Sequence, residues 1–398
     1  MLRRVCEHLG IPDPAAFGAV LTAQLLNGVG YGMIFPVAAF YGEKAGLGPA
    51  LITLLVAAHP LARLVSAPLW GRLADRVGRR PVLLTGIALQ AAGHLVFGLS
   101  GNALGLGLGR ALTGLGAADA VAAAAITGDL TPVEHRARAF GLLRAASGLG
   151  TLGGPVLGGL LGLWDLRLPG LAAGLACLVN LVQVALRCPE TRHTTTSAGG
   201  LLPPWAALGM AAIAAGAIGM AEAVAPLAAE HVLVPTLTLP AGWTPSQAGV
   251  LVTVGIILAW GVTTAIFDGA LSARIVERLG ERPALAFGLL AWAVAFSLTP
   301  PVYRIGVVPG AFAVMLTAIP VSITSVALVT WVSRRAGRDA QGRATGALTA
   351  AAAVGEFVGP ASAGSFYERW YGLPYLVAAG CLALVALLVP TLPRSPSS

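Results

Sequence analysis

Six charged side chains lie inside long apolar stretches of the sequence, namely Arg63, Arg110, Asp119, Arg144, Glu222 and Glu356, and His59 and His94 are weaker ionisable candidates there. An ionisable group at membrane depth is costly unless it is paired or hydrated, so such residues mark function by default. A carboxylate that takes up a proton from one side of a membrane and releases it to the other could couple transport to a pH gradient. The carboxylates therefore predict proton coupling. The alternative for each of them is a structural ion pair with one of the arginines.

Three carboxylates compete for the role of proton carrier. Asp119 lies in the apolar stretch 103–128, and Glu222 lies in the stretch 204–228, which opens the second half of the chain. Glu356 follows Gly355 and comes three residues before another glycine, so we expect close helix packing to bury it too firmly to titrate. We therefore rank Asp119 and Glu222 together, above Glu356.

The elements that carry these side chains are predicted to be transmembrane helices. The chain is 56% hydrophobic and 11% charged, with a mean hydropathy of +0.81, whereas an average soluble domain has about 25% charged residues. A spanning helix needs about 20 mostly apolar residues, and the runs are too long and too uniform for barrel strands. The fold class is therefore an all-α polytopic membrane protein. Twelve spans are predicted, at 15–39, 51–70, 82–99, 103–128, 139–162, 169–186, 204–228, 246–267, 284–299, 305–332, 344–366 and 373–391.

The basic residues gather in alternate loops between these spans. Arginines occur at both chain ends and cluster in the segments 72–80, 274–282 and 334–343, whereas the opposite loops hold only Lys44, Arg167, Arg304 and Arg369. Cytoplasmic loops of membrane proteins carry the excess of Lys and Arg, so both termini are predicted to be cytoplasmic. The same distribution explains the net charge of +8 without nucleic acid, which we exclude as a partner.

The sequence offers no constellation for catalysis or metal binding. It contains no phosphate-binding loop, no metal cluster and no nucleophile–base pair, and its four cysteines are scattered without metal-ligand spacing. A membrane enzyme or a receptor that transports nothing is therefore disfavoured. We expect no enzyme activity, no cofactor and no metal.

Two segments of the first half recur in the second half. The charged segment GRLADRVGRRP (71–81) aligns without gaps with ARIVERLGERP (273–283), so Asp75 matches Glu277 and Gly78 matches Gly280. RAFGLLRAASGLGTLGGPVLGG (138–159) aligns in the same way with RATGALTAAAAVGEFVGPASAG (343–364). The chain is therefore predicted to be a duplicated six-helix unit, with an N-terminal bundle at 1–186, a cytoplasmic linker at 187–203 and a C-terminal bundle at 204–398.

The charged segment is predicted to be a short cytoplasmic loop between two helices. Its arginines would meet anionic lipid headgroups, and Gly71 and Gly78 would permit a tight turn. Asp75 has no role in setting topology. A carboxylate beside arginines or at a helix N-terminus gains up to about 2 kcal/mol, which suits a contact that forms and breaks in each cycle. Because the acid recurs at Glu277, a gating role is favoured over a purely topological one.

These motifs resemble those of the major facilitator superfamily. The segment 71–80 is similar to that family's loop between helices 2 and 3, and Arg110-Ala-Leu-Thr-Gly114 resembles its fourth-helix motif. The run Gly150-x-x-x-Gly154-Pro155 is similar to the fifth-helix motif of drug/proton antiporters. The resemblance covers the whole chain and is closest to the 12-helix branch that contains the tetracycline exporters. It implies two six-helix pseudo-symmetric bundles and proton-coupled drug efflux by alternating access.

The resemblance also implies roles for individual residues. It places Arg110 in proton coupling beside the three carboxylates, and it makes Asp75 brace the closed cytoplasmic gate against the eleventh helix. The bent, glycine-lined fifth helix would control leakage and rocking between the bundles. The predicted gating residues are Gly71, Asp75, Arg76, Gly78, Arg79, Arg80, Gly154, Pro155, Glu277 and Arg278.

The resemblance breaks down at the predicted substrate site. The tetracycline exporters place an aspartate in helix 1 nine residues before a proline, whereas this chain has Asn27 nine residues before Pro36. Polar and aromatic residues predicted to bind substrate are Gln24, Asn27, Tyr31, Arg63 and Trp260. The leading interpretation is efflux of small amphipathic compounds. The alternative is a carrier of a specific anionic metabolite, proton-coupled or by exchange, with Arg63 and Arg110 clamping the anion.

The expected surroundings follow from this interpretation. The partners are a small-molecule substrate, protons and the lipid bilayer. We expect a monomer in the inner (plasma) membrane of a prokaryote that crosses the bilayer many times.

Overall fold

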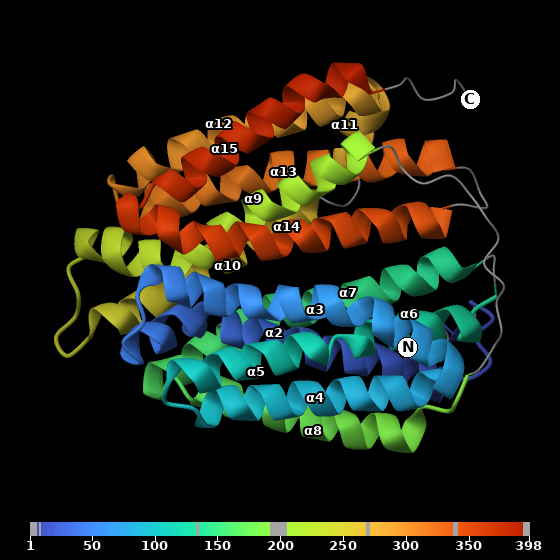
Figure 1. Ribbon diagram of the computed structural model, residues 1–398. Helices are drawn as coiled ribbons and strands as arrows, with labels where there is room; N and C mark the ends of the chain where they lie inside the picture. Colours follow the sequence, from blue (N-terminus) through green and yellow to red (C-terminus); the bar gives the residue numbers. More distant parts are fainter. Residues whose placement is uncertain are drawn as a thin grey trace. The chain divides into compact units, whose positions relative to one another are not determined.

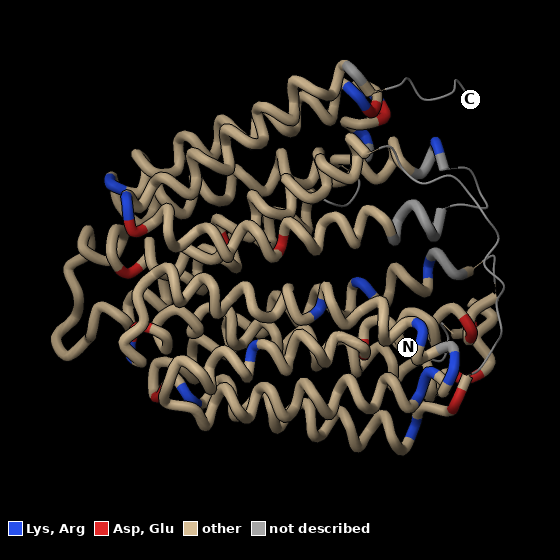
Figure 2. The backbone as a smooth tube through the Cα atoms, in the orientation of Figure 1, with Lys and Arg blue, Asp and Glu red and all other residues tan. Residues whose placement is uncertain are grey.

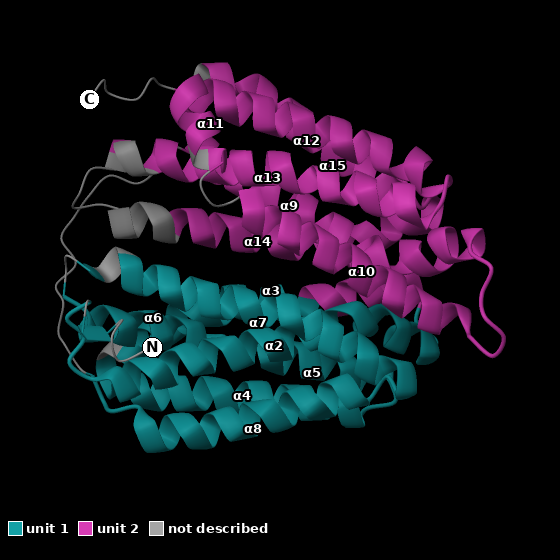
Figure 3. Cartoon of the chain, turned by 180° about the vertical axis from the view of Figure 1, so that it is seen from behind, with its two compact units in different colours: residues 1–47, 58–196 teal, residues 48–57, 197–398 magenta. Residues whose placement is uncertain are grey.

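The computed structural model describes residues 6–7, 9–132, 135–191, 205–267, 271–336 and 341–392. Every regular element in these ranges is a helix. The chain divides into two compact units, shown in different colours in Figure 3. Unit 1 comprises residues 1–47 and 58–196, and unit 2 comprises residues 48–57 and 197–398.

Unit 1 is built from helices that run alongside one another (Figure 1). They are α2 (Pro14–Lys44), α3 (Pro49–Val77), α4 (Arg79–Leu99), α5 (Ala103–Leu115), α6 (Ala118–Leu130), α7 (Arg136–Trp164) and α8 (Leu168–Arg187). The first residues of α3, up to Ala57, belong to unit 2. Within unit 1, α2 packs on α7 and α8, and α4 packs on α5, α6 and α8.

Unit 2 repeats this kind of helix packing. Its helices are α9 (Trp205–Ala228), the π-helical turn η2 (Ala229–Leu233), α10 (Pro245–Ile266), α11 (Ser272–Leu279), α12 (Glu281–Tyr303), α13 (Val307–Ala336), α14 (Gln341–Arg369) and α15 (Leu373–Leu388). Here α9 packs on α14 and α15, and α12 packs on α13 and α15. Most charged residues in the described chain lie near helix ends (Figure 2).

Each predicted span coincides with a helix or a helix pair. Within the described residues, ten helical segments are long and apolar enough to cross a membrane, and α15 is a shorter apolar helix. The short prediction at 284–299 extends to the full length of α12. The span predicted at 103–128 corresponds to one candidate span, Ala103–Leu130, which is interrupted at Gly116 and Ala117 between α5 and α6. Most of the predicted linker, residues 192–203, lies outside the described residues.

Local sequence explains where several helices begin. Asp13 caps α2 by accepting hydrogen bonds from the backbone N–H groups of Ala15 and Ala16, at 3.0 and 2.9 Å. Thr244 and Gln247 form a capping box at the start of α10. Both caps satisfy backbone donors that the first turn of a helix leaves without intrahelical partners.

The closest helix contacts in the two units rest on glycine. A Cβ atom on Gly154 of α7 would lie 2.7 Å from the Cα atom of Gly32 on α2. In unit 2, a Cβ atom on Gly359 of α14 would lie 3.0 Å from the Cα atom of Gly216 on α9. Only glycine fits at such separations, so the paired sequence motifs at 138–159 and 343–364 build the same backbone-on-backbone contact in each unit.

Candidate functional site

Asp119 lies in the first turn of α6, directly after the break between α5 and α6. Its side chain is buried, with a residue exposure of 3%. The backbone N–H of Ala120 donates to its carboxylate. The N-terminus of a helix carries positive partial charge, so the break between α5 and α6 places a favourable dipole beside a carboxylate inside the unit.

Three side-chain amides converge on this carboxylate from two other helices. From α2, Gln24 Nε2 donates to Asp119 Oδ2 at 3.2 Å, and Asn27 Nδ2 donates to the same oxygen. From α4, Gln90 Nε2 donates to Asp119 Oδ1 at 2.6 Å. Gln90 Nε2 also donates to the carbonyl oxygen of Gly116 at 3.1 Å, so the break between α5 and α6 is held by the same amide.

A chain of amides continues from Asn27 to α8. Asn180 Nδ2 donates to Asn27 Oδ1 at 3.0 Å and to the backbone carbonyl of Ala23 at 3.3 Å. Gln183 Nε2 donates to Asn180 Oδ1 at 3.0 Å and to the backbone carbonyl of Ala19 at 3.0 Å. We call Asn27, Asn180 and Gln183 the amide chain. It connects the carboxylate on α6 through α2 to α8.

The surroundings of Asp119 bear on the alternative of a structural ion pair. In the described part of the protein, Asp119 forms hydrogen bonds with neutral amides and no ion pair with Arg63, Arg110 or Arg144. Arg144 is exposed on α7. A structural ion pair is therefore not the reason for this buried acid. Such a site can hold a negative charge, or a proton that neutralises it, without a permanent counter-ion.

A second polar cluster in unit 1 surrounds Arg110 on α5. The guanidinium carbon lies 5.7 Å from the centre of the Tyr31 ring, a cation–π contact. The Tyr31 ring lies 5.1 Å from the His59 ring, and His59 Nδ1 is 3.1 Å from Thr113 Oγ1. Arg63 is half-buried one turn further along α3. Of the predicted substrate residues, Tyr31 therefore contacts Arg110 and Arg63 lies one turn from His59, while Gln24 and Asn27 belong to the Asp119 site.

The two acidic candidates of unit 2 have different surroundings. Glu222 on α9 is half-buried, and it has no hydrogen bond or ion pair with any residue that the structure describes. Glu356 on α14 is also half-buried and lies beside the close contact of α9 with α14. Trp260 on α10 donates from Nε1 to Thr317 Oγ1 on α13 at 3.1 Å, which fixes the indole ring within unit 2.

The charged segment is mostly helical. The prediction of a loop over residues 71–80 is wrong, because α3 continues to Val77 and α4 begins at Arg79. The turn is made by Gly78 alone, with a φ of 103° that favours glycine. Gly71 lies in the helix with open space around it, so it makes no turn. Arg76 is exposed, and the side chain of Asp75 lies outside the described part of the structure.

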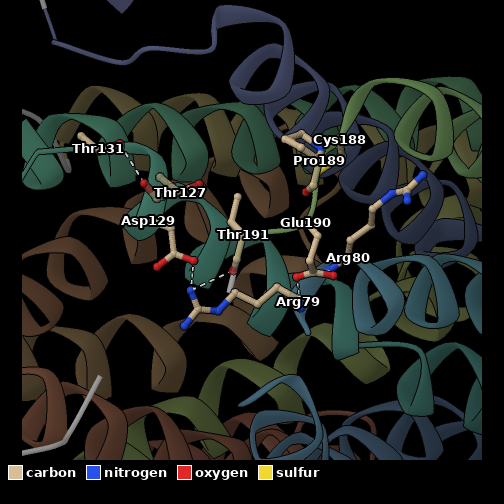
Figure 4. Close-up of polar contacts among 9 residues, drawn as sticks. All are labelled: Arg79, Arg80, Thr127, Asp129, Thr131, Cys188, Pro189, Glu190 and Thr191. Atoms are coloured by element: carbon tan, nitrogen blue, oxygen red, sulfur yellow. Dashed lines mark hydrogen bonds and ion pairs between the residues drawn. The ribbon is translucent and has the colours of Figure 1, made fainter. Parts of the chain in front are cut away.

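Two arginines of the segment are anchored within unit 1, and Figure 4 shows the ion pair of the first, Arg79. Arg79 forms an ion pair with Asp129 at the end of α6, and both side chains are almost fully buried. Arg80 donates from its guanidinium to the backbone carbonyl of Ala185 on α8 at 2.6 Å. Asp129 is therefore buried at the end of α6, where a buried arginine neutralises its charge.

Glu190 caps the start of α4 from a distant part of the chain. Its Oε1 accepts from the backbone N–H of Arg79 at 2.7 Å, and its Oε2 accepts from the N–H of Arg80 at 3.3 Å (Figure 4). A carboxylate at a helix N-terminus is stabilised by unpaired N–H groups and by the helix dipole. The segment that follows α8 is therefore fixed to the turn at Gly78.

Unit 2 repeats the glycine turn and the anchored arginine that follows it. Gly280 makes the turn between α11 and α12 with a φ of 83°, as Gly78 does in unit 1. Arg282, the counterpart of Arg80, donates to the carbonyl of Pro390, just after α15. Glu277 and Arg278, predicted to act in gating, are both exposed on α11.

The predicted gate residues of α7 lie at the contact with α2. Gly154 faces Gly32, and the Cδ atom of Pro155 lies 2.8 Å from the position that a Cβ atom on Gly32 would take. In unit 2, the Cδ atom of Pro360 lies 2.9 Å from the corresponding position on Gly219.

Comparison with known proteins agrees with the resemblance drawn from the sequence motifs. A family profile described as Major Facilitator Superfamily matches residues 20–231 and 205–398. The chain belongs to the Major Facilitator Superfamily.

Members of this superfamily with resistance functions are among the relatives. The "Tetracycline resistance protein, class E" of Escherichia coli is 31% identical over 396 residues, covering 93% of each chain. "Multidrug resistance protein 2" of Bacillus subtilis (strain 168) is 25% identical and covers 90% of each chain. Among solved structures, the nucleoside transporter NupG has a TM-score of 0.72 at 11% identity, covering 94% of this chain and 98% of its own. These relatives confirm the family and the helical fold that the motifs predicted.

Several residues of the site were absent from the sequence-based predictions. Gln90, Asn180 and Gln183 are uncharged, so a search for charged groups in apolar stretches did not detect them. Their signal is the rarity of amide side chains in membrane helices, where each needs a hydrogen-bond partner. Glu190 was missed because the helix start that it caps is distant in sequence. Asp129 was missed because its partner, Arg79, was expected to meet lipid headgroups.

The cysteines of the described residues form no disulfide. All four are free; Cys6, Cys177 and Cys188 are buried and Cys381 is exposed. Burial raises the pKa of the Cys188 thiol, just after α8, to about 11. This thiol is therefore protonated and unreactive at neutral pH.

Proposed function

We propose that this member of the Major Facilitator Superfamily exports small amphipathic compounds in exchange for protons, by alternating access. The observation that carries the proposal is the buried carboxylate of Asp119, which is held by amides and a helix N-terminus and has no ion pair within the described residues. A resistance function is supported by relatives named as tetracycline and multidrug resistance proteins.

The orientation completes the proposal. Both termini and the turn at Gly78 lie on the cytoplasmic side, because the arginines of the charged segment are concentrated there. The protein works as a monomer in the plasma membrane of a prokaryote. Its units alternate access to the two sides, with the glycine contacts of α2 on α7 and of α9 on α14 holding each unit rigid.

The proton carrier is Asp119, with Glu222 as the second candidate. When the pathway opens to the acidic side, Asp119 takes a proton; when it opens to the cytoplasm, the proton leaves and the three amides again donate to the carboxylate. Arg110, whose guanidinium lies over the Tyr31 ring, provides a fixed positive charge in the same unit as Asp119. Glu356 ranks third.

The substrate contacts are proposed on the exposed or half-buried members of the predicted set. Tyr31 and Arg63 offer an aromatic face and a charge for an amphipathic ligand within unit 1, and Trp260 offers an aromatic face within unit 2. Gln24 and Asn27 are engaged by Asp119 and act on substrate only through it.

The second candidate function is carriage of a specific anionic metabolite. It is favoured by one observation, the buried guanidinium of Arg110 against Tyr31, which could pair with an anion that enters the site.

Transport into proteoliposomes distinguishes the two functions. The purified protein is reconstituted, and uptake of a tetracycline, of an amphipathic dye such as ethidium and of a small organic anion is measured with and without an imposed pH gradient. The proposal predicts that the gradient drives accumulation of the tetracycline or the dye. Accumulation of the anion alone would replace it with the carrier function, and no transport of any probe under a gradient would contradict both.

A further inference from the structure

The hydrogen bonds around Asp119 all point in one direction. Gln183 donates to Asn180, Asn180 donates to Asn27, and Asn27 donates to Asp119. Each amide in the chain therefore presents its N–H group towards the carboxylate and its oxygen away from it. Because an ionised carboxylate only accepts hydrogen bonds, this direction satisfies the charged form of Asp119.

A proton on Asp119 conflicts with that direction. A protonated carboxyl group carries an O–H donor, and at Oδ2 this donor would meet the N–H donors of Gln24 and Asn27. Rotating the Asn27 amide by half a turn relieves the conflict, but it then turns the Asn27 N–H towards the N–H of Asn180. The conflict therefore passes along the chain until its last member has rotated.

Gln183, at the far end of the amide chain, has an oxygen that can accept a hydrogen bond after this rotation. In the structure, Gln183 Oε1 is buried and has no hydrogen-bond partner among the described residues. After reversal, Asp119 donates to Asn27, Asn27 donates to Asn180, and Asn180 donates to Gln183 Oε1. The oxygen that has no partner in the charged state thus becomes the last acceptor in the protonated state, and Gln183 Nε2, which gives up both of its acceptors, becomes the group without a partner.

Reversal also changes how α8 is held to α2. At present Asn180 and Gln183 donate to the backbone carbonyls of Ala23 and Ala19, at 3.3 and 3.0 Å. Rotation of the two amides would turn their oxygens towards these carbonyls and break both bonds. The carbonyls keep their acceptor role inside α2, because they also accept backbone hydrogen bonds within the helix.

We propose that Asn27, Asn180 and Gln183 form a reversible chain, in which protonation of Asp119 reverses the hydrogen-bond direction and releases the side-chain bonds between α8 and α2. The inference rests on the proposed function, because it takes Asp119 as the proton carrier. Asn180 and Gln183 are positioning residues that sense the proton through Asn27.

Other titratable groups near the site are limited in the described structure. The thiol of Cys177 on α8 interacts electrostatically with Asp119. His94 on α4 and Cys177 both border Gly30 of α2, at 3.3 and 3.8 Å from the position that a Cβ atom would take there. The amides of α2 and α4 that contact Asp119 carry no charge.

Infrared difference spectroscopy on the purified protein tests the chain directly. Acidification should produce a carboxylic-acid C=O band that is absent in Asp119→Asn, together with side-chain amide bands that shift when the Asn and Gln side chains are labelled with ¹⁵N. Asn180→Leu, which cuts the chain at its centre, should keep the acid band and lose most of the amide changes. An acid band in the wild-type protein without label-sensitive amide bands would overturn the proposal, with no variant required.

A transport assay separates failure of the chain from failure of the proposed function. Gln183→Met keeps side-chain length and removes the amide, so it should lower pH-gradient-driven transport several-fold while leaving substrate exchange without a gradient near the wild-type rate. Val182→Met is the matched control, because Val182 is 59% exposed beside Gln183 on α8. If Asp119→Asn retains driven transport, the proposed function fails. If Asp119→Asn loses driven transport while Gln183→Met and Asn180→Leu retain it, only the proposal of a reversible amide chain is wrong.

Discussion

Units 1 and 2 share their backbone contacts and differ in how they treat charge. Both make a turn with a positive-φ glycine, both attach the second residue after that turn to a carbonyl at the end of a helix, and both pack two helices through glycine. In unit 1 a buried acid is surrounded by amides, whereas Glu222 in unit 2 has no hydrogen bond within the described chain. The duplicated features therefore build the scaffold, and the features found in one unit are the candidates for coupling.

The shared glycine contact should be equally sensitive in both units. We expect Gly154→Val and Gly359→Val each to abolish transport, because a Cβ atom at either position would lie 3.0 Å or less from the backbone of the facing helix. Gly153→Val is the control, since no atom lies within 4 Å of a Cβ atom there. Transport and membrane-extracted yield are measured for all three. A large effect in one unit only would show that the glycine contacts of the two units are not equivalent.

The anchored arginine of unit 1 should matter far more than its exposed neighbour. Arg79→Gln leaves Asp129 buried without its ion-pair partner, which costs about 3 kcal/mol. Arg76→Gln removes an exposed charge from the same segment and should change stability by less than about 0.5 kcal/mol. Thermal unfolding in detergent measures both. Equal effects would mean that the ion pair with Asp129 contributes nothing.

The two acids should differ in their effect on stability. Asp119→Asn places an amide donor against amide donors, and leaving one buried donor unsatisfied costs about 1–3 kcal/mol. Glu222→Gln breaks no hydrogen bond among the described residues, so its effect on the free energy of unfolding should stay within about 0.5 kcal/mol. Thermal unfolding of the two variants side by side checks this. A loss of stability in Glu222→Gln as large as in Asp119→Asn would show that the surroundings of the two acids are alike.

The sequence predicted the scaffold more completely than the site. Apolar runs and the repeated motifs located the helices, because membrane burial requires long uncharged segments and duplication preserves glycines. Asp119 was detectable because a charge in an apolar stretch is rare. Its partners Gln90, Asn180 and Gln183 were not, because the facing of an amide depends on which helices are neighbours.

The break between α5 and α6 shows a second reason for this limit. Gly114 and Gly116 flank the point where the helix stops, but glycine also lies inside continuous helices of this chain, as at Gly150 and Gly154. At the break, the carbonyl of Gly116 accepts a tertiary hydrogen bond from Gln90, which the sequence alone does not reveal. For the charged segment the prediction missed helix where it had missed a break at α5 and α6. Its polar composition suggested a loop, whereas the residues are helical and a single glycine makes the turn.

The central claim is that Asp119 carries the proton that drives export. The most direct measurement is transport in proteoliposomes by the wild-type protein, Asp119→Asn and Glu222→Gln, each assayed with a pH gradient and by exchange without one. The account predicts that Asp119→Asn retains exchange but loses accumulation driven by the gradient. If the loss occurs only in Glu222→Gln, the carrier lies in unit 2. If both variants accumulate substrate as the wild-type protein does, the proton route proposed for this protein is wrong.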